Sequence, residues 1–203
     1  MKEFEIGTSY YPDNWKAADW ETDLKNMTDY GITLIRFGEF SWSWIEPRNG
    51  EFGFSKMDRF LDLAERMGVK VILGTGTATP PPWVTTSFPD CRLININGLP
   101  CYSPRHFVCY DHPSLREITE RYIRSLISRY ASHPAIEAWQ VDNEPMIGGE
   151  TVESPTARDI SSFYCYCPHT IASFRQWLTK KYKNVEELNE HWANNFWSQR
   201  YGS

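Results

Sequence analysis

The stretch Gly68-Val69-Lys70-Val71-Ile72-Leu73-Gly74 decides the fold class that this sequence predicts. Its apolar run from Val69 to Leu73 is short and bounded by glycines, which is typical of a buried strand in a parallel sheet. The segment before it, Ser55–Met67, has apolar residues at helical spacing and Ser55 as its N-cap. The segment after it contains Pro80-Pro81-Pro82, which predicts an extended loop to about Asp111. Loops of that length in a compact domain are usually functional or disordered.

The same alternation of strand and helix continues toward both ends of the chain. Strands are predicted at Phe4–Tyr10, Thr33–Phe40 and Ile136–Val141, and helices at Trp15–Tyr30, Pro113–Tyr130, Thr170–Lys181 and Val185–Ala193. Four successive β-α units predict a parallel sheet with helices outside it. The long loops after Leu73 and Val141 leave the carboxyl ends of strands, where (β/α)8 barrels build their active sites.

The fold class is therefore α/β, and two architectures compete for it. A doubly wound sheet usually has a glycine-rich phosphate turn after its first strand, but Ser9-Tyr10-Tyr11-Pro12 contains no such motif. The TIM (β/α)8 barrel is therefore favoured, with residues 1–203 as one truncated domain that holds the first four units. Half a barrel leaves two open parallel edges, so the chain is either truncated or closes by pairing with another copy.

Composition and charge exclude several classes of partner. A net charge of −5 without a basic run argues against binding to nucleic acid. No segment approaches the roughly 18 apolar residues that span a bilayer, and the N-terminus has no apolar signal region, so we expect a cytoplasmic protein. Five cysteines at irregular spacing indicate reduced thiols or a metal site rather than a disulfide framework. Nine tryptophans suit either core packing, the commoner use, or stacking on sugar rings.

The motif with the clearest chemistry is Trp139-Gln140-Val141-Asp142-Asn143-Glu144-Pro145, at the end of the fourth predicted strand. A glycosidase needs a carboxylic acid that protonates the leaving oxygen, and Glu144 is placed to supply it. Asn143 can hydrogen-bond a sugar 2-hydroxyl. A simple turn after the strand is the alternative explanation for Asn143 and Glu144, and a structural carboxylate is the favoured one for Asp142.

Five stretches of the chain resemble glycoside hydrolase family 42, the β-galactosidases. They lie in family order and together cover nearly the whole chain. They are GTSYYPDNW (7–15), IRFGEFSWSWIEPRNGEFGFSKMDRFLDLA (35–64), GTGTATPPPW (74–83), WQVDNE (139–144) and FRQWLTKKYKNVEELNEHWANNFWSQRYGS (174–203).

The resemblance implies a retaining glycosidase built on a (β/α)8 barrel. It implies that Glu144 is the general acid/base and that Asn143 contacts the sugar 2-hydroxyl. Arg36 matches an arginine that approaches the nucleophile and the sugar, with a structural ion pair as the alternative. Trp197 matches an active-site aromatic residue, with core packing as the alternative.

The family's nucleophile is a glutamate on a later strand, beyond position 203. A retaining enzyme places its two carboxylates about 5–5.5 Å apart, so this chain alone is expected to hydrolyse little or nothing. Glu39 lies at the end of the second predicted strand, but the family places the nucleophile elsewhere, so it receives no such role.

The resemblance also implies a structural zinc ion held by four cysteines. Cys109, Cys165 and Cys167 match three of them, while the fourth position is Thr170, which is a poor zinc ligand. His169 is adjacent and could complete a Cys3His site. No redox or organic cofactor is implied.

Pro145–Ser162, which contains Gly148-Gly149, predicts a mobile loop that either shapes substrate entry or is a tolerated insertion.

The first hypothesis is thus a fragment of a galactoside-cleaving enzyme that is trimeric when intact. A non-catalytic carbohydrate-binding or assembly fragment is the second. A barrel glycosidase for another sugar, such as a β-glucoside, a fucoside or an α-L-arabinopyranoside, is the third, because the Asn-Glu motif does not separate these substrates.

Overall fold

The computed structural model describes residues 4–145 and 164–203. Within them, four strands form one parallel sheet in the order β1-β2-β3-β4. The strands are β1 (Ile6–Ser9), β2 (Ile32–Phe37), β3 (Lys70–Gly74) and β4 (Ile136–Gln140). The predicted β-α alternation is confirmed, and strands that follow one another in sequence are neighbours in the sheet, without the reversal of order that marks a doubly wound sheet.

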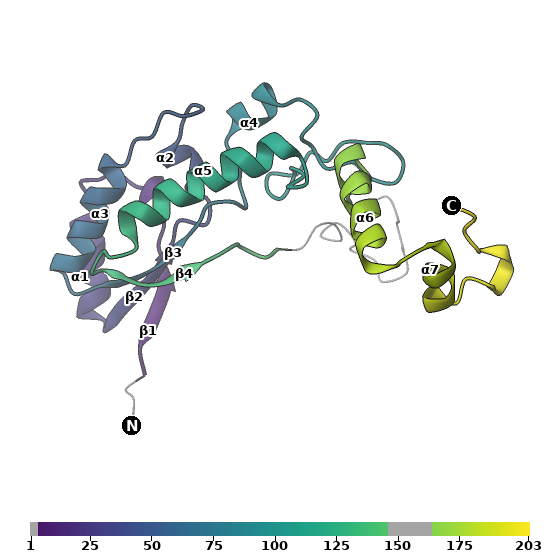
Figure 1. The fold of residues 1–203 in the computed structure, drawn as a ribbon. Coiled ribbons are helices and arrows are strands. Elements are labelled where there is room, and N and C mark those ends of the chain that lie inside the picture. Colours follow the sequence, from purple (N-terminus) through teal and green to yellow (C-terminus); the bar gives the residue numbers. More distant parts are fainter. Residues whose placement is uncertain (1–3, 146–163) are drawn as a thin grey trace.

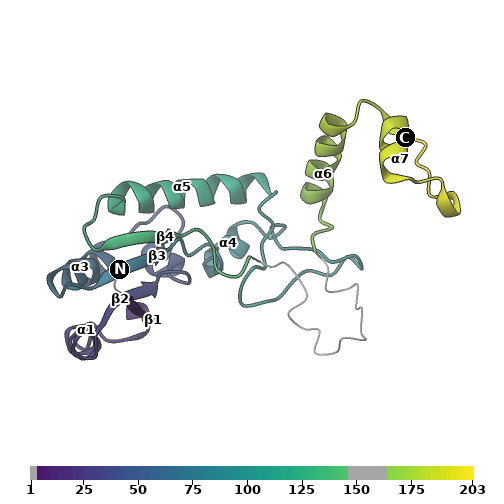
Figure 2. The same cartoon turned by 90° about the horizontal axis from the view of Figure 1, so that it is seen from below.

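Three long helices cover one face of this sheet (Figures 1 and 2). They are α1 (Trp20–Asp29), α3 (Ser55–Arg66) and α5 (Pro113–Tyr130). Helices on a single face, with the strands in sequential order, are what a barrel wall requires. No helix in the described part of the chain is both long enough and apolar enough to cross a membrane.

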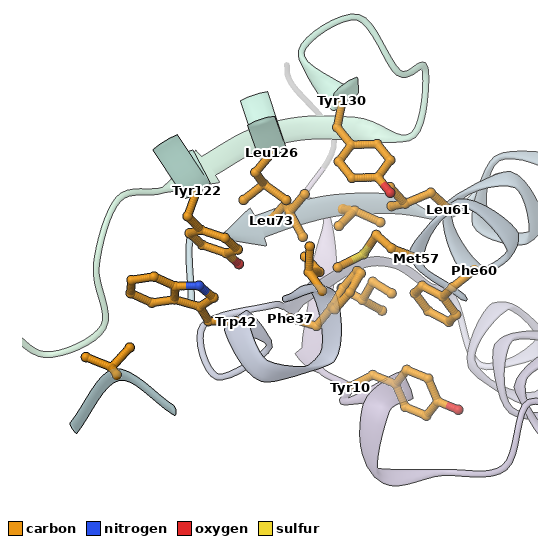
Figure 3. Close-up of a cluster of buried hydrophobic side chains, with 14 of the residues drawn as sticks. Tyr10, Phe37, Trp42, Met57, Phe60, Leu61, Leu73, Tyr122, Leu126 and Tyr130 are labelled. Atoms are coloured by element: carbon orange, nitrogen blue, oxygen red, sulfur yellow. The ribbon is translucent and has the colours of Figure 1, made fainter. Parts of the chain in front are cut away.

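The core lies between the sheet and these helices (Figure 3). Phe37 packs edge-on against Phe60 at 5.0 Å between ring centroids, and Trp42 stacks on Tyr122 at 4.5 Å. All four side chains are buried. Aromatic pairs of this kind stabilise a core beyond their buried area, which explains why the chain carries so many aromatic residues there.

In the two central strands, β2 and β3, buried side chains alternate with more exposed ones. Along β2, Ile35 and Phe37 are buried whereas Leu34 and Arg36 are half-exposed. Because side chains alternate along a strand, Arg36 lies on the face away from the helices. In a barrel this face is the interior, so the alternation directs Arg36 inward.

The segments predicted as loops contain short helices. The predicted proline-rich loop holds α4 (Pro82–Ser87), with Pro82 in its first turn, where the missing N–H costs nothing. The stretch after β2 holds α2 (Trp42–Ile45), and a 3-10 turn (Pro12–Asn14) precedes α1. The first predicted helix therefore begins at Trp20 rather than Trp15.

The C-terminal part extends away from the sheet as an arm (Figure 1). It contains α6 (Pro168–Lys181), α7 (Val185–Trp192) and a 3-10 helix (Phe196–Ser198). No residue of α6 is buried. The predicted loop Pro145–Ser162 lies outside the described residues except for Pro145.

Two glycines let the ends of β2 and β3 approach each other closely. Gly38 follows β2 with a φ of +99°, a left-handed conformation that favours glycine. A Cβ atom on Gly74, the last residue of β3, would lie 2.4 Å from the backbone nitrogen of Glu39. The backbone of Glu39 therefore packs directly against Gly74.

We expect Gly74→Ala to lower the free energy of unfolding by about 1–3 kcal/mol, because the added methyl group meets backbone that can only shift as a unit. The melting temperature, followed by circular dichroism, should fall by several degrees. Gly53→Ala is the matched control, since a Cβ there meets only the Ile45 carbonyl oxygen at 4.0 Å. Equal melting temperatures for the two variants would contradict the close approach.

Candidate active site

Arg36 joins the carboxyl ends of three strands. Its Nη2 lies 3.0 Å from Oε1 of Glu39 and donates to the Ser9 hydroxyl at 3.1 Å. Its Nη1 donates to Oδ1 of Asn143 at 3.4 Å. The guanidinium group thus contacts residues at the ends of β1, β2 and β4. The ion pair that was the alternative explanation for Arg36 is therefore present, and its role at the sugar stays a prediction.

Glu39 is a buried carboxylate, with a side chain only 1% exposed. Its Oε1 accepts a hydrogen bond from the Tyr11 hydroxyl at 2.9 Å as well as the contact from Arg36. Burial and the neighbouring Glu39 carboxylate raise the pKa of Tyr11, so this phenol remains a donor. The other oxygen, Oε2, is buried and has no hydrogen-bond partner within the described residues. A buried charge needs compensation, and Arg36 supplies it.

A second, half-buried carboxylate lies close to this pair. Asp13 Oδ2 accepts from the Ser41 hydroxyl at 3.0 Å. Burial raises the pKa of Asp13, and the negative charge of Glu39 adds to the effect. Two neighbouring carboxylates repel each other, and the positive charge of Arg36 beside Glu39 offsets this repulsion.

Asn143 is buried and held by several contacts at once. Its Oδ1 accepts from Gln140 Nε2 at 3.1 Å and from Arg36, which orients the side-chain amide. Its backbone carbonyl accepts from His106 Nε2 at 2.6 Å. Within the described residues no hydrogen bond from its Nδ2 is found. The contact of Asn143 with a sugar hydroxyl stays a prediction.

Asp142 and two threonines fix the end of β4 to the end of β3. The Asp142 carboxylate accepts from the Asn143 backbone nitrogen at 2.8 Å and from the Thr77 hydroxyl at 3.4 Å. The Thr75 hydroxyl donates to the Val141 carbonyl at 2.6 Å. These contacts agree with the structural role favoured for Asp142 from the sequence.

Glu144 follows in a left-handed conformation, with a φ of +50°, which is uncommon for residues other than glycine. Its Oε2 lies 2.6 Å from Nη1 of Arg105, and its side chain is 62% exposed. Sequence reasoning missed Arg105. The only signal was a cation in the long loop that leaves the carboxyl end of β3, the same edge of the sheet as Glu144.

A cleft of about 550 Å³ lies between the segment after β2 and the loop after β3. Its walls include Phe40, Pro81, Tyr102 and Phe107. Neither Arg105 nor Glu144 is among the residues that line it.

Trp197 does not join this cluster. It lies in the 3-10 helix at the end of the C-terminal arm, is 80% exposed, and stacks on Phe196 at 5.0 Å between ring centroids. Core packing, the alternative for Trp197, is therefore wrong for this chain. The segment that carries it lies far from the sheet (Figures 1 and 2).

The three cysteines expected at a zinc site do come together. The sulfur atoms of Cys109, Cys165 and Cys167 lie within 4.8 Å of one another, and those of Cys109 and Cys167 are 3.4 Å apart. The thiol of Cys109 and the backbone N–H groups of Ile94 and Cys167 lower the pKa of Cys165. The hydrogen bond with Cys165 and burial raise the pKa of the Cys109 thiol. This donor set fits a thiophilic metal ion.

His169, the expected substitute for the fourth cysteine, belongs to a different cluster. Its Nε2 lies 3.5 Å from Asp90, and its ring is 4.5 Å from the ring of His112. His112 Nε2 lies 3.2 Å from the same carboxylate. Pro168 lies in the first turn of α6 and sets the direction of this segment. As a result Thr170, rather than His169, lies beside the sulfurs of Cys109 and Cys167. The Cys3His alternative therefore does not match the structure.

Comparison with known proteins identifies the family. The family model described as β-galactosidase, glycoside hydrolase family 42, matches residues 9–203. The β-galactosidase BgaH of Haloferax lucentense is 39% identical over 97% of this chain, and β-galactosidase bgaB of Geobacillus kaustophilus is 38% identical over 96%. The chain spans 28% and 27% of the length of these two relatives.

Solved structures give the same result for the fold. The β-galactosidase of the psychrophilic Marinomonas ef1 matches 98% of this chain with a TM-score of 0.83 and 36% identity. That of Halorubrum lacusprofundi matches 98% with a TM-score of 0.83 and 34% identity. The chain covers 29% and 28% of those two proteins. The four β-α units are thus the first half of a (β/α)8 barrel, and the chain belongs to the glycoside hydrolase family 42 β-galactosidases.

Proposed function

We propose that residues 1–203 form the N-terminal half of a catalytic barrel that hydrolyses terminal β-D-galactosides with retention of configuration. The observation that carries the proposal is the contact of Arg36 with Asn143, the residue before Glu144, at the carboxyl ends of β2 and β4, in a chain that belongs to this family. Active sites of (β/α)8 barrels lie at this end of the sheet.

Glu144 is the proposed general acid/base. It protonates the glycosidic oxygen as the leaving group departs, and then deprotonates the water that attacks the glycosyl-enzyme intermediate. Arg105 holds its carboxylate from one side at 2.6 Å. Because the side chain of Glu144 is otherwise exposed, this contact is what fixes its direction in the absence of a sugar.

Asn143 and Arg36 are the proposed sugar-binding residues. The Nδ2 group of Asn143 donates to the 2-hydroxyl, a contact that strengthens in the transition state. Arg36 approaches the nucleophile and keeps it ionised and oriented. Trp197 is proposed to reach the sugar only when the rest of the barrel repositions the C-terminal arm.

The nucleophile is proposed to lie outside residues 1–203. Glu39 does not fill this role, because its Oε1 is held by Arg36 and Tyr11 and its side chain is buried. Turnover needs no redox or organic cofactor, and a metal ion at the cysteines would act structurally. The intact protein is proposed to be a cytoplasmic homotrimer without nucleic-acid or membrane partners.

In a polypeptide that contains the whole barrel, we expect Glu144→Gln to lose at least about 100-fold in kcat toward p-nitrophenyl β-D-galactoside, since general acid/base catalysis contributes at that scale. Azide should rescue the variant on a substrate with a better leaving group and should yield β-galactosyl azide, because a small anion replaces the activated water. Product of the α configuration, or no rescue in a folded variant, would contradict the assigned role.

The 203-residue chain alone should bind galactose weakly, with a Kd on the order of millimolar, because only half of the site is present. Asn143→Ala should weaken this binding by roughly fivefold or more, since one sugar hydrogen bond is lost. Asn97→Ala is the control, because Asn97 is exposed in a turn of the loop after β3. Calorimetry with galactose, glucose and L-arabinose would check both points.

Equal affinity in the Asn143→Ala and Asn97→Ala variants would contradict the placement of the site. Clear preference for glucose or arabinose would favour a barrel glycosidase for another sugar. Tight galactose binding, combined with no turnover from the whole barrel, would favour a carbohydrate-binding protein.

A further inference from the structure

The cleft between the segment after β2 and the loop after β3 has no part in the site described above. Its volume of about 550 Å³ lies within the range of about 300–1,000 Å³ that small-molecule sites occupy. Pro80, Pro81 and Pro82 form part of its wall. Because proline fixes its own φ angle, this part of the wall is rigid before a ligand arrives. Size and rigidity thus suit a pre-formed small-molecule site.

Both walls of the cleft continue along the chain into residues of the candidate active site. On one wall Phe40 directly follows Glu39. On the other wall Pro104 directly precedes Arg105, whose Nη1 lies 2.6 Å from Oε2 of Glu144. Each wall is therefore one residue along the chain from a side chain of the site, and the cleft is a neighbouring compartment of that site.

This position decides which part of a substrate the cleft receives. The proposed general acid, Glu144, protonates the glycosidic oxygen, which joins the terminal sugar to its leaving group. Arg36 and Asn143 are the proposed contacts of the terminal sugar, and neither of them lines the cleft. A group that extends from the glycosidic oxygen past Arg105 toward Pro104 therefore belongs to the leaving group.

The walls offer two contacts that suit a sugar ring. Tyr102 is 78% exposed, so its aromatic ring is accessible to the C–H face of a pyranose. The guanidinium carbon of Arg92 lies 4.6 Å from the ring centroid of Tyr102 and 5.2 Å from that of Phe107. Arg92 Nη1 also donates to the Cys101 carbonyl at 3.0 Å. These contacts fix a group with five N–H donors, which sugar hydroxyls can accept.

The charge of the cleft favours a neutral ligand. Among the described residues that line it, Arg92 is the one charged side chain, and two aromatic rings already accompany its guanidinium group. The remaining polarity comes from four hydroxyl side chains, Ser43, Thr79, Thr85 and Ser103. An anion site would carry several basic groups in place of these hydroxyls. The lining therefore suits a neutral ring with hydroxyl groups.

We propose that this cleft binds the first sugar residue of the leaving group, with its ring against Tyr102 and its hydroxyls at Arg92. The substrates are then galactosides whose leaving group is a neutral pyranose sugar. This inference rests on the proposed galactosidase function and adds the substrate class to it. No bond is made or broken in the cleft, which holds the leaving group while Glu144 protonates the glycosidic oxygen.

The test compares two kinds of substrate in a polypeptide that contains the whole barrel. β-D-Galactosyl fluoride has a leaving group too small to reach the cleft, whereas β-galactobioses with 1→3, 1→4 and 1→6 linkages carry a second pyranose. Tyr102→Ala should lower kcat/KM by about tenfold for the best galactobiose, because one stacking contact is lost. The same variant should leave kcat/KM for the fluoride unchanged, and Arg92→Ala should act in the same direction.

Tyr30→Ala is the matched control. Tyr30 is another exposed tyrosine, at 85%, and it lies at the end of α1 and outside the cleft. Its variant should match the wild type on both kinds of substrate.

The fluoride separates the two levels of the account. A wild type that does not cleave galactosyl fluoride would contradict the proposed function itself. If the fluoride is cleaved, three results would overturn the inference about the cleft. The first is failure to cleave any of the galactobioses. The second is a Tyr102→Ala variant that equals Tyr30→Ala on galactobiose, or that loses equally on the fluoride. The third is an equal loss toward p-nitrophenyl β-D-galactoside, which would make the cleft a general apolar groove.

Discussion

The ion pair between Arg36 and the buried carboxylate of Glu39 is the interaction on which the rest of the site depends. A carboxylate that is 1% exposed is tolerated only beside a fixed cation and a hydroxyl donor, which Arg36 and Tyr11 provide. The same guanidinium orients the side chain of Asn143 through its Nη1. The pair itself depends on the close packing of Gly38 and Gly74, because any larger residue at Gly74 would displace the backbone of Glu39.

One long loop connects this site to the cysteine cluster. After β3, the chain first supplies Thr75 and Thr77, which hold the end of β4. It later supplies Arg105, which contacts Glu144, and then Cys109, which meets the cysteines at the start of α6. A metal ion at the cysteines would therefore fix both the loop that carries Arg105 and the start of the C-terminal arm. In this way a bound ion would influence a site that it does not touch.

Periodicity and turn residues predicted the four strands and the long helices, because both patterns follow from local geometry. In the structure, strand alternation accounts for the burial of Val71 and Leu73 and for the position of Arg36 on the face away from the helices. Arg105 could not be found this way, because a loop residue meets Glu144 only through the folded path of the chain. His169 was misplaced for a related reason: the direction of α6 after Pro168, not ligand chemistry, decides which side chain faces the sulfurs. Trp197 is 80% exposed in the C-terminal arm, and its place in the site stays a prediction.

The central claim is that the carboxyl ends of β2 and β4 form the sugar-binding half of a galactosidase site. Nuclear magnetic resonance of the chain during a galactose titration tests it most directly, through the Arg36 Nε–H and Asn143 Nδ2 signals. The account predicts that both signals shift together with a single dissociation constant, while the Trp197 indole signal stays in place. Shifts confined to the C-terminal arm, with Arg36 and Asn143 unmoved, would contradict it.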